Sequence, residues 1–187
     1  MVATTTTPKL FLTDYESYNN GTQFEFGHWV DLSEFSSADE FLEYIETHFK
    51  AADEKSPLPC GTPREETMFT DYEGMPRALY SESMSAKELA NLFEFLALDE
   101  DDRRKTAFIM EQGESVEYAL SKYSDVIMHE DTDNAKYELF EMYYPEAEQA
   151  EQACPYVEIN YDRFIKENFT EFEYEGQHYL VEDSWNY

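Results

Sequence analysis

The spacing of apolar residues in the first third of the chain predicts two strands and a helix. An apolar run at 9–12 and an alternating segment at 24–30 flank the turn signal Asn19-Asn20-Gly21, a pattern typical of a β-hairpin. Apolar residues then recur at helical spacing, which predicts an amphipathic helix with one buried stripe. That stripe consists of Phe41, Leu42, Ile45 and Phe49.

Polar residues mark the predicted helix starts. The sequence Ser37-Ala38-Asp39-Glu40 has the form of a capping box, and Ser85-Ala86-Lys87-Glu88 repeats that form ahead of a second helix. Between these two helices, residues 53–64 contain three prolines and a glycine and are predicted to be a loop. Residues 66–71 are predicted to add a further strand.

The middle of the chain is predicted to be a small helical bundle at 84–122. A helix with Leu89 and Leu92 on its apolar face is followed by one that opens at Asp99, because acidic residues suit the positive end of a helix. A third helix carries Val116 and Ala119.

The last third returns to mixed structure. Residues 125–129 and 156–159 are predicted to be short strands, and Phe172 to Val181 a hairpin around Glu175-Gly176. Asp133 and Asn160 are predicted to begin helices. The apolar face of the first of these helices is predicted to hold Tyr137, Phe140 and Tyr144.

This order of elements predicts an α+β chain with three parts. Residues 1–8 are expected to be a disordered tail. Residues 9–82 and 123–187 are expected to form two small α+β domains, which flank a helical domain at 83–122.

Charge changes this picture most. The chain has 42 Asp and Glu residues against 13 Lys and Arg, a formal net charge of −29, yet 17% of its residues are aromatic. Acidic disordered segments are poor in aromatic residues, so the charge is predicted to lie on a folded surface. Such a surface repels nucleic acid and anionic membranes and attracts basic surfaces.

Motifs for catalysis or metal binding are absent from the sequence. The six glycines are scattered, the four histidines have no metal-ligand spacing, and Cys60 and Cys154 lie far apart. After Asp131 and Asp133, Lys136 stands where a calcium loop needs glycine. The missing motifs favour a protein without metal or cofactor. No signal peptide or membrane span is recognisable, which favours a cytoplasmic protein. A carboxylate-pair hydrolase and a merely solubilising or salt-adapted surface remain alternatives.

The carboxylates themselves can stand in for DNA phosphates. Duplex DNA carries one charge per about 1.7 Å, so 29 charges would match about 50 Å, and a symmetric dimer about twice that. The candidate residues lie on predicted outer helix faces and caps. They are Asp39, Glu40, Glu43, Glu46, Asp99, Glu100, Asp101, Asp102, Glu111, Glu114, Glu117, Glu130, Asp131, Asp133, Glu138 and Glu141, with Glu146, Glu148 and Glu151 as an extension.

Short motifs along the chain match one family in order and spacing. They are Tyr-Asn-Asn-Gly at 18–21, Gly-His-Trp-Val-Asp at 27–31, Glu-Thr-Met-Phe-Thr-Asp-Tyr-Glu-Gly-Met-Pro at 66–76 and Tyr-Ser-Asp-Val-Ile-Met-His at 123–129. With these motifs the chain resembles the ArdA antirestriction proteins of conjugative plasmids and transposons. It departs from them in a longer N-terminal tail and in the 53–64 loop.

The resemblance implies an elongated homodimer that mimics bent B-DNA and is not an enzyme. Such a protein occupies the basic DNA-binding groove in the methyltransferase core of type I restriction–modification enzymes, and binds neither nucleic acid nor membrane. A general acidic module that binds another basic DNA-binding protein is the alternative.

Overall fold

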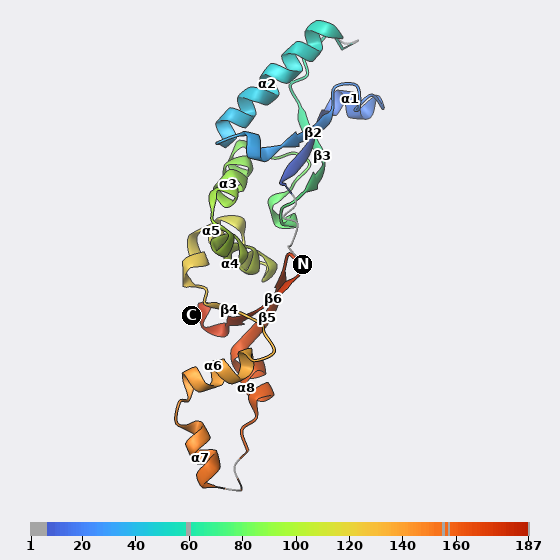
Figure 1. Cartoon of the computed structure of the whole chain (residues 1–187). Coiled ribbons are helices and arrows are strands. Elements are labelled where there is room, and N and C mark those ends of the chain that lie inside the picture. Colours follow the sequence, from blue (N-terminus) through green and yellow to red (C-terminus); the bar gives the residue numbers. More distant parts are fainter. Residues whose placement is uncertain (1–6, 59–60, 155, 157, 187) are drawn as a thin grey trace.

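The computed structural model describes residues 7–58, 61–154, 156 and 158–186. The molecule is elongated, with the N-terminal elements at one end and helix α7 at the other (Figure 1). Two three-stranded antiparallel sheets lie on either side of a central group of helices. The predicted α+β class is therefore confirmed.

The N-terminal sheet has the strand order β2-β1-β3, with β1 at Lys9–Asp14, β2 at His28–Asp31 and β3 at Thr67–Glu73. Helix α2, Ala38–Lys55, is amphipathic as predicted and buries Phe41, Ile45 and Phe49. Leu10 and Leu12, which alternate with outward residues along β1, are fully buried in the same cluster.

The connection between β1 and β2 is not the simple hairpin turn predicted. It contains a short helix, α1 at Tyr15–Asn19, and residues 24–26 lie in a turn rather than a strand. The Gly27 N–H donates to the Gln23 carbonyl at 3.0 Å, so the chain closes a turn before it can extend at His28. A Cβ at Gly27 would lie 2.1 Å from that carbonyl oxygen, which explains why glycine is needed here.

The proline-rich connection between α2 and β3 is held by a buried arginine. α2 continues to Lys55, so the predicted loop begins later than expected. Arg64 donates through its guanidinium to Asp53 and to the Ser56 carbonyl, and its Nε lies 3.4 Å from the buried Asp14 carboxylate. The guanidinium also stacks 4.9 Å from the Phe26 ring centroid.

The central helices agree with the prediction. They are α3 at Ala86–Ala97, α4 at Glu100–Glu111 and α5 at Val116–Lys122, preceded by a short 3₁₀ turn, η2, at Arg77–Leu79. At the start of α3, Ser85 accepts from the Glu88 N–H, and the Glu88 carboxylate accepts from the Ser85 N–H. This capping box is therefore confirmed.

The capping box at α2 forms only in part. Ser37 accepts from the Glu40 N–H as predicted, but the Glu40 carboxylate accepts from the backbone and hydroxyl of Ser36 instead of from Ser37. Both donors of Ser36, its N–H and its hydroxyl, bind the same Glu40 carboxylate oxygen, at 2.7 and 2.8 Å.

The C-terminal sheet has the order β4-β6-β5, with β4 at Met128–Glu130, β5 at Phe169–Tyr174 and β6 at Gln177–Glu182. The hairpin around Glu175-Gly176 is confirmed, with Phe172 opposite Tyr179. Both faces of this sheet are covered. Tyr179 and Val181 belong to the central cluster, whereas Leu180 packs with α6, Ala135–Tyr143, and α8, Tyr161–Asn168.

Several predictions for the last third are wrong. Residues 123–125 form a 3₁₀ helix, η3, so β4 starts only at Met128, and residues 158–159 are not in a strand, while 155 and 157 lie outside the described residues. Helix α6 begins after Asn134 rather than Asp133 and buries Ala135 and Leu139. Tyr137 and Tyr144, predicted on its buried face, are exposed. Helix α7, Ala147–Ala153, was not predicted, because its sequence has no apolar stripe.

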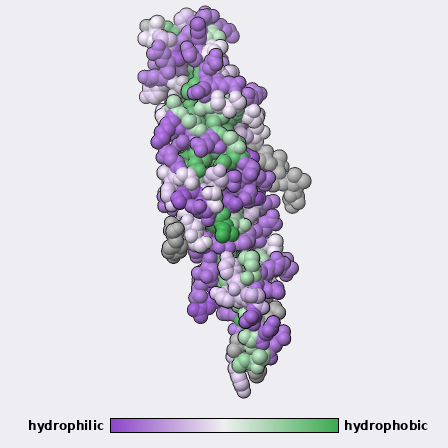
Figure 2. Space-filling model, turned by 90° about the vertical axis from the view of Figure 1, so that its left-hand side faces the viewer, coloured by the Kyte–Doolittle hydropathy of each residue, from purple (hydrophilic) through white to green (hydrophobic). Residues whose placement is uncertain are grey.

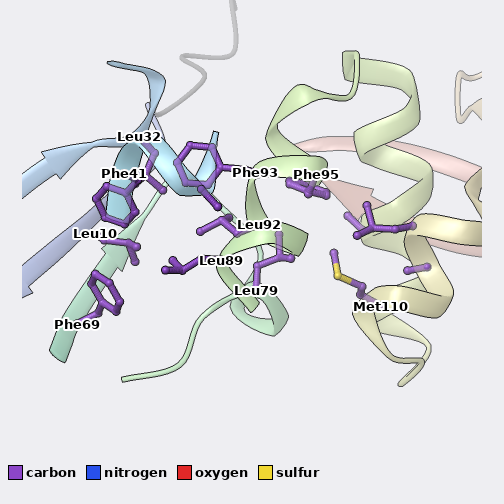
Figure 3. Packing of buried hydrophobic residues seen from close by; sticks show 14 of the residues in the cluster. Leu10, Leu32, Phe41, Phe69, Leu79, Leu89, Leu92, Phe93, Phe95 and Met110 are labelled. Carbon is purple, nitrogen blue, oxygen red and sulfur yellow. The ribbon is translucent and has the colours of Figure 1, made fainter. Parts of the chain in front are cut away.

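One hydrophobic cluster runs through most of the molecule. It joins Leu10 and Phe41 in the N-terminal part to Leu92, Phe95 and Phe108 in the central helices and onward to the C-terminal sheet. Figure 3 shows its course from the N-terminal sheet through α3 to Met110 on α4. The cluster crosses both expected domain boundaries, and the division into three domains stays a prediction.

Candidate functional site

The acidic side chains lie almost entirely on the surface. Among those that the structure describes, only Asp14 is buried. Half-buried carboxylates are Asp31, Asp53, Asp102, Glu151 and Glu182. Of the sixteen candidate residues, all except Asp102 are therefore exposed, and the face in Figure 2 is mostly hydrophilic with apolar patches near its middle.

The first acidic group lies on the solvent side of α2. Asp39, Glu43 and Glu46 follow the helical repeat on the face opposite Phe41 and Ile45, and are exposed for that reason. Glu40 accepts hydrogen bonds from Ser36, and the backbone bond, the largest cause, lowers the pKa of its carboxyl. All four side chains are thus exposed to a partner on this side of α2.

The second group surrounds the start of α4 and is partly neutralised. Asp99 caps the helix by accepting from the Asp102 N–H at 2.9 Å. Arg104 lies 3.0 Å from Asp101 and 3.8 Å from Glu100, and Lys105 lies 2.6 Å from Asp101. The hydrogen bond from Lys105 lowers the pKa of Asp101. These ion pairs weaken the field that this group presents to a partner.

The third group combines two carboxylates outside the ion pairs of the described chain with one that is paired to a lysine. Glu111, at the end of α4, and Glu114, in the next turn, are exposed and outside the ion pairs found in the described chain. Glu117 on α5 instead binds Lys87 at 2.6 Å, and this hydrogen bond lowers its pKa. Glu111 and Glu114 are therefore the freer charges.

The fourth group follows β4 and α6. All of its members are exposed: Glu130, Asp131, Asp133, Glu138 and Glu141. The proposed extension is mixed, because Glu146 is exposed whereas Glu151 is half-buried and accepts from the Ile159 N–H at 3.1 Å. The side chain of Glu148 lies outside the described residues.

Strands supply acidic residues that the sequence reasoning missed. On β5, Glu171 and Glu173 are exposed and flank the buried Phe172, and on β3 Asp71 and Glu73 are exposed. The signal was the strand period of two, which places alternate residues on opposite faces.

Basic side chains are largely occupied by their own neighbours. Ion pairs hold seven of them among the described residues: Arg64, Lys87, Arg104, Lys105, Lys122, Lys136 and Arg163. Arg77 stacks on Tyr80, 4.9 Å from the ring centroid, and donates to its carbonyl. The cations are thus spread among acids, and the surface between them stays negative.

Two histidines, His28 at the start of β2 and His48 on α2, pack against each other with ring centroids 4.6 Å apart. His28 bonds the Tyr44 hydroxyl at 2.6 Å through Nε2, and both His28 and His48 bond the Phe26 carbonyl. Burial lowers the pKa of His48. These bonds join α2 to the turn before β2. Within the described residues, no three His, Cys, Asp or Glu side chains gather to hold a metal ion.

The fold and this surface define an elongated acidic α+β protein whose most prominent chemistry is an array of exposed carboxylates. None of the helices that the structure describes is long and apolar enough to cross a membrane. The sequence model of the antirestriction protein family ArdA matches residues 10–183. The chain therefore belongs to the ArdA family of antirestriction proteins. No curated protein matches the chain.

Proposed function

We propose that the protein inhibits type I restriction–modification enzymes by presenting its carboxylates in place of DNA phosphates. The observation that carries this proposal is the placement of exposed acidic groups along the length of an elongated molecule, on α2, α4, α5 and α6. The partner surface is the basic groove that holds DNA in the methyltransferase core. An enzyme whose groove is occupied cannot bind incoming DNA.

Electrostatics supports this assignment. A DNA-binding groove is lined by Lys and Arg residues that neutralise phosphates, and carboxylates are anions that the same residues can pair with. Each exposed pair contributes only about 0.2–1 kcal/mol, so affinity has to come from many pairs together. No single carboxylate is then essential.

Homodimerisation forms part of the proposal. A second copy related by two-fold symmetry would about double the length of groove that is covered. Exposed apolar residues available for such a contact include Met142 and Tyr143 on α6. The sedimentation coefficient and small-angle scattering profile are expected to fit an elongated dimer, and a compact monomer would contradict this part.

Competition with DNA tests the proposal directly. A type I methyltransferase bound to fluorescent DNA is titrated with the protein at low salt, and release of the DNA is followed by anisotropy. Complete displacement is expected, with an inhibition constant that rises steeply with salt. Absence of displacement from any type I enzyme would refute the proposal, whereas equal displacement of DNA from unrelated basic proteins would favour a general acidic module.

A further inference from the structure

An apolar pocket opens between the N-terminal and C-terminal parts of the molecule. It has a volume of about 820 Å³ and lies where the segment after β3, helix α4 and the β5–β6 hairpin meet. This volume is within the range of pockets that bind ligands, about 300–1,000 Å³. An acidic array that only replaces phosphates has no need of an apolar hollow.

Buried apolar side chains form much of the pocket wall. Ala107 and Met110 of α4 and Phe172 of β5 line it and are each less than a tenth exposed. Met75, from the segment after β3, adds a second thioether, and methionine side chains adapt to the shape of what they contact. Tyr174 also lines the pocket, and burial raises its pKa to about 12, so its hydroxyl stays neutral at physiological pH.

The pocket mouth belongs to the acidic surface. Glu111, one of the candidate phosphate substitutes, lines the pocket, and so does Glu175 at the tip of the hairpin. The basic group in the lining, Arg77, is held by stacking on Tyr72 and Tyr80 and by its hydrogen bond to the Tyr80 carbonyl. An approaching basic surface therefore meets carboxylates next to an apolar hollow.

We propose that this pocket receives an apolar side chain, aromatic or long and aliphatic, that projects from the basic groove of the partner enzyme. The proposal rests on the proposed function. Proteins that distort DNA often wedge apolar side chains between its bases, and enzymes that modify a base extrude it from the stack. Carboxylates replace the phosphates but provide no apolar site in which such a side chain could be buried. The pocket supplies an apolar space beside the anions.

Two variants that add the same charge test this inference. Ala78 is exposed and lines the pocket, whereas Ala90 is exposed on α3 and does not line it. Ala78→Glu is expected to weaken displacement of DNA from the type I methyltransferase by about tenfold or more, because an apolar side chain entering the pocket would bury the new carboxylate without a partner. Ala90→Glu is expected to leave displacement unchanged or improve it slightly, because it only adds negative charge. Equal affinities for the two variants would overturn the inference.

A second pair of variants removes charge from the test. Ala78→Trp fills the pocket and is expected to weaken displacement by about tenfold, while Ala90→Trp changes it less than about twofold. Thermal melts and sedimentation of all four variants check folding and assembly. Native-like binding by folded Ala78→Trp, or a changed oligomeric state that makes a second copy the occupant, would overturn the inference. Native protein that fails to compete at all would instead refute the proposed function, and this inference with it.

Discussion

Arg64 is the buried cation of a protein whose acidic side chains are nearly all exposed. Its guanidinium joins Asp53 and Ser56, at the end of α2, to Asp14, at the end of β1. Asp14 in turn caps α1 by accepting from the Ser17 N–H at 2.8 Å. Arg64 therefore links the end of α2 to the end of β1, two segments that are distant in sequence.

Removal of the Arg64 guanidinium is expected to destabilise the protein. In Arg64→Met the buried Asp14 carboxylate loses its compensating charge, which costs about 3 kcal/mol of unfolding free energy. Urea unfolding measures the loss. Arg77→Met, which removes an exposed arginine that also stacks on tyrosines, is the control and is expected to cost about 1 kcal/mol or less. Equal losses would contradict a structural role for the buried ion pair.

The sequence could not predict this arrangement. Arg64 lies in a loop whose prolines and glycine identify its class but not its contacts, and nothing near it in sequence indicates Asp14 as a partner. Similarly, the sequence shows Gly27 only as part of a motif, whereas the fold shows that a Cβ there would clash with the Gln23 carbonyl oxygen. Local patterns predict conformation, whereas contacts between distant segments require the fold.

At the scale of elements, helix caps were the most predictable features. Four-residue patterns predict both capping boxes, and the two differ because the Glu40 carboxylate accepts from Ser36 rather than from Ser37. Strands were less predictable, because a short apolar segment can have the composition of a strand without forming one, as residues 158–159 show. The prediction placed the large tyrosines Tyr137 and Tyr144 on the buried face of α6, but both are exposed, and the smaller Ala135 and Leu139 are buried instead.

The free energy of unfolding that the α3 capping box contributes is expected to depend on pH. The hydrogen bond from the Ser85 hydroxyl lowers the pKa of Glu88 below its ordinary value of 4.5, so this bond stabilises the folded state above that pH and is lost as pH falls through the folded-state pKa. Ser85→Ala is expected to cost about 1 kcal/mol at pH 7 and less at pH 3.5.

Ser37→Ala is the matched comparison for this prediction. Ser37 accepts one cap hydrogen bond, and the Glu40 carboxylate is bound by Ser36 instead. The unfolding free energy lost in Ser37→Ala is therefore expected to be about half of that lost in Ser85→Ala. Because Glu40 keeps its partner, this cost should change little between the two pH values. Urea midpoints at both pH values measure the difference, and identical pH profiles for the two variants would argue against a contribution from the Glu88 carboxylate.

At the scale of the whole molecule, a net charge of −29 makes stability and binding respond to salt in opposite directions. Self-repulsion destabilises the folded state, and salt screens it, so the melting temperature is expected to rise by several degrees from about 20 to about 500 mM NaCl. Over the same range the affinity for a basic partner is expected to fall. Calorimetry and the DNA competition assay measure the two trends, and a melting temperature that falls would contradict the first.

The position of charges, and not only their number, is expected to matter for binding. The triple variant Asp39→Asn, Glu43→Gln, Glu46→Gln removes three carboxylates that are outside the described ion pairs, and a loss of about tenfold in affinity is expected. Asp101→Asn, Glu117→Gln, Asp125→Asn removes the same charge from residues already paired with lysines and is expected to lose less. Equal losses would mean that net charge alone decides affinity.

The order in which the chain is synthesised adds a consequence of the hydrophobic cluster. Phe108 on α4 packs 5.4 Å from both Phe172 and Trp185, ring centroid to centroid, so late parts of the chain help to cover this side of the helix. A chain truncated after residue 168 is therefore expected to bind a hydrophobic dye that the chain of residues 1–187 does not bind. Translation would thus have to pass β6 and the segment that carries Trp185 before this side of the central helices is shielded.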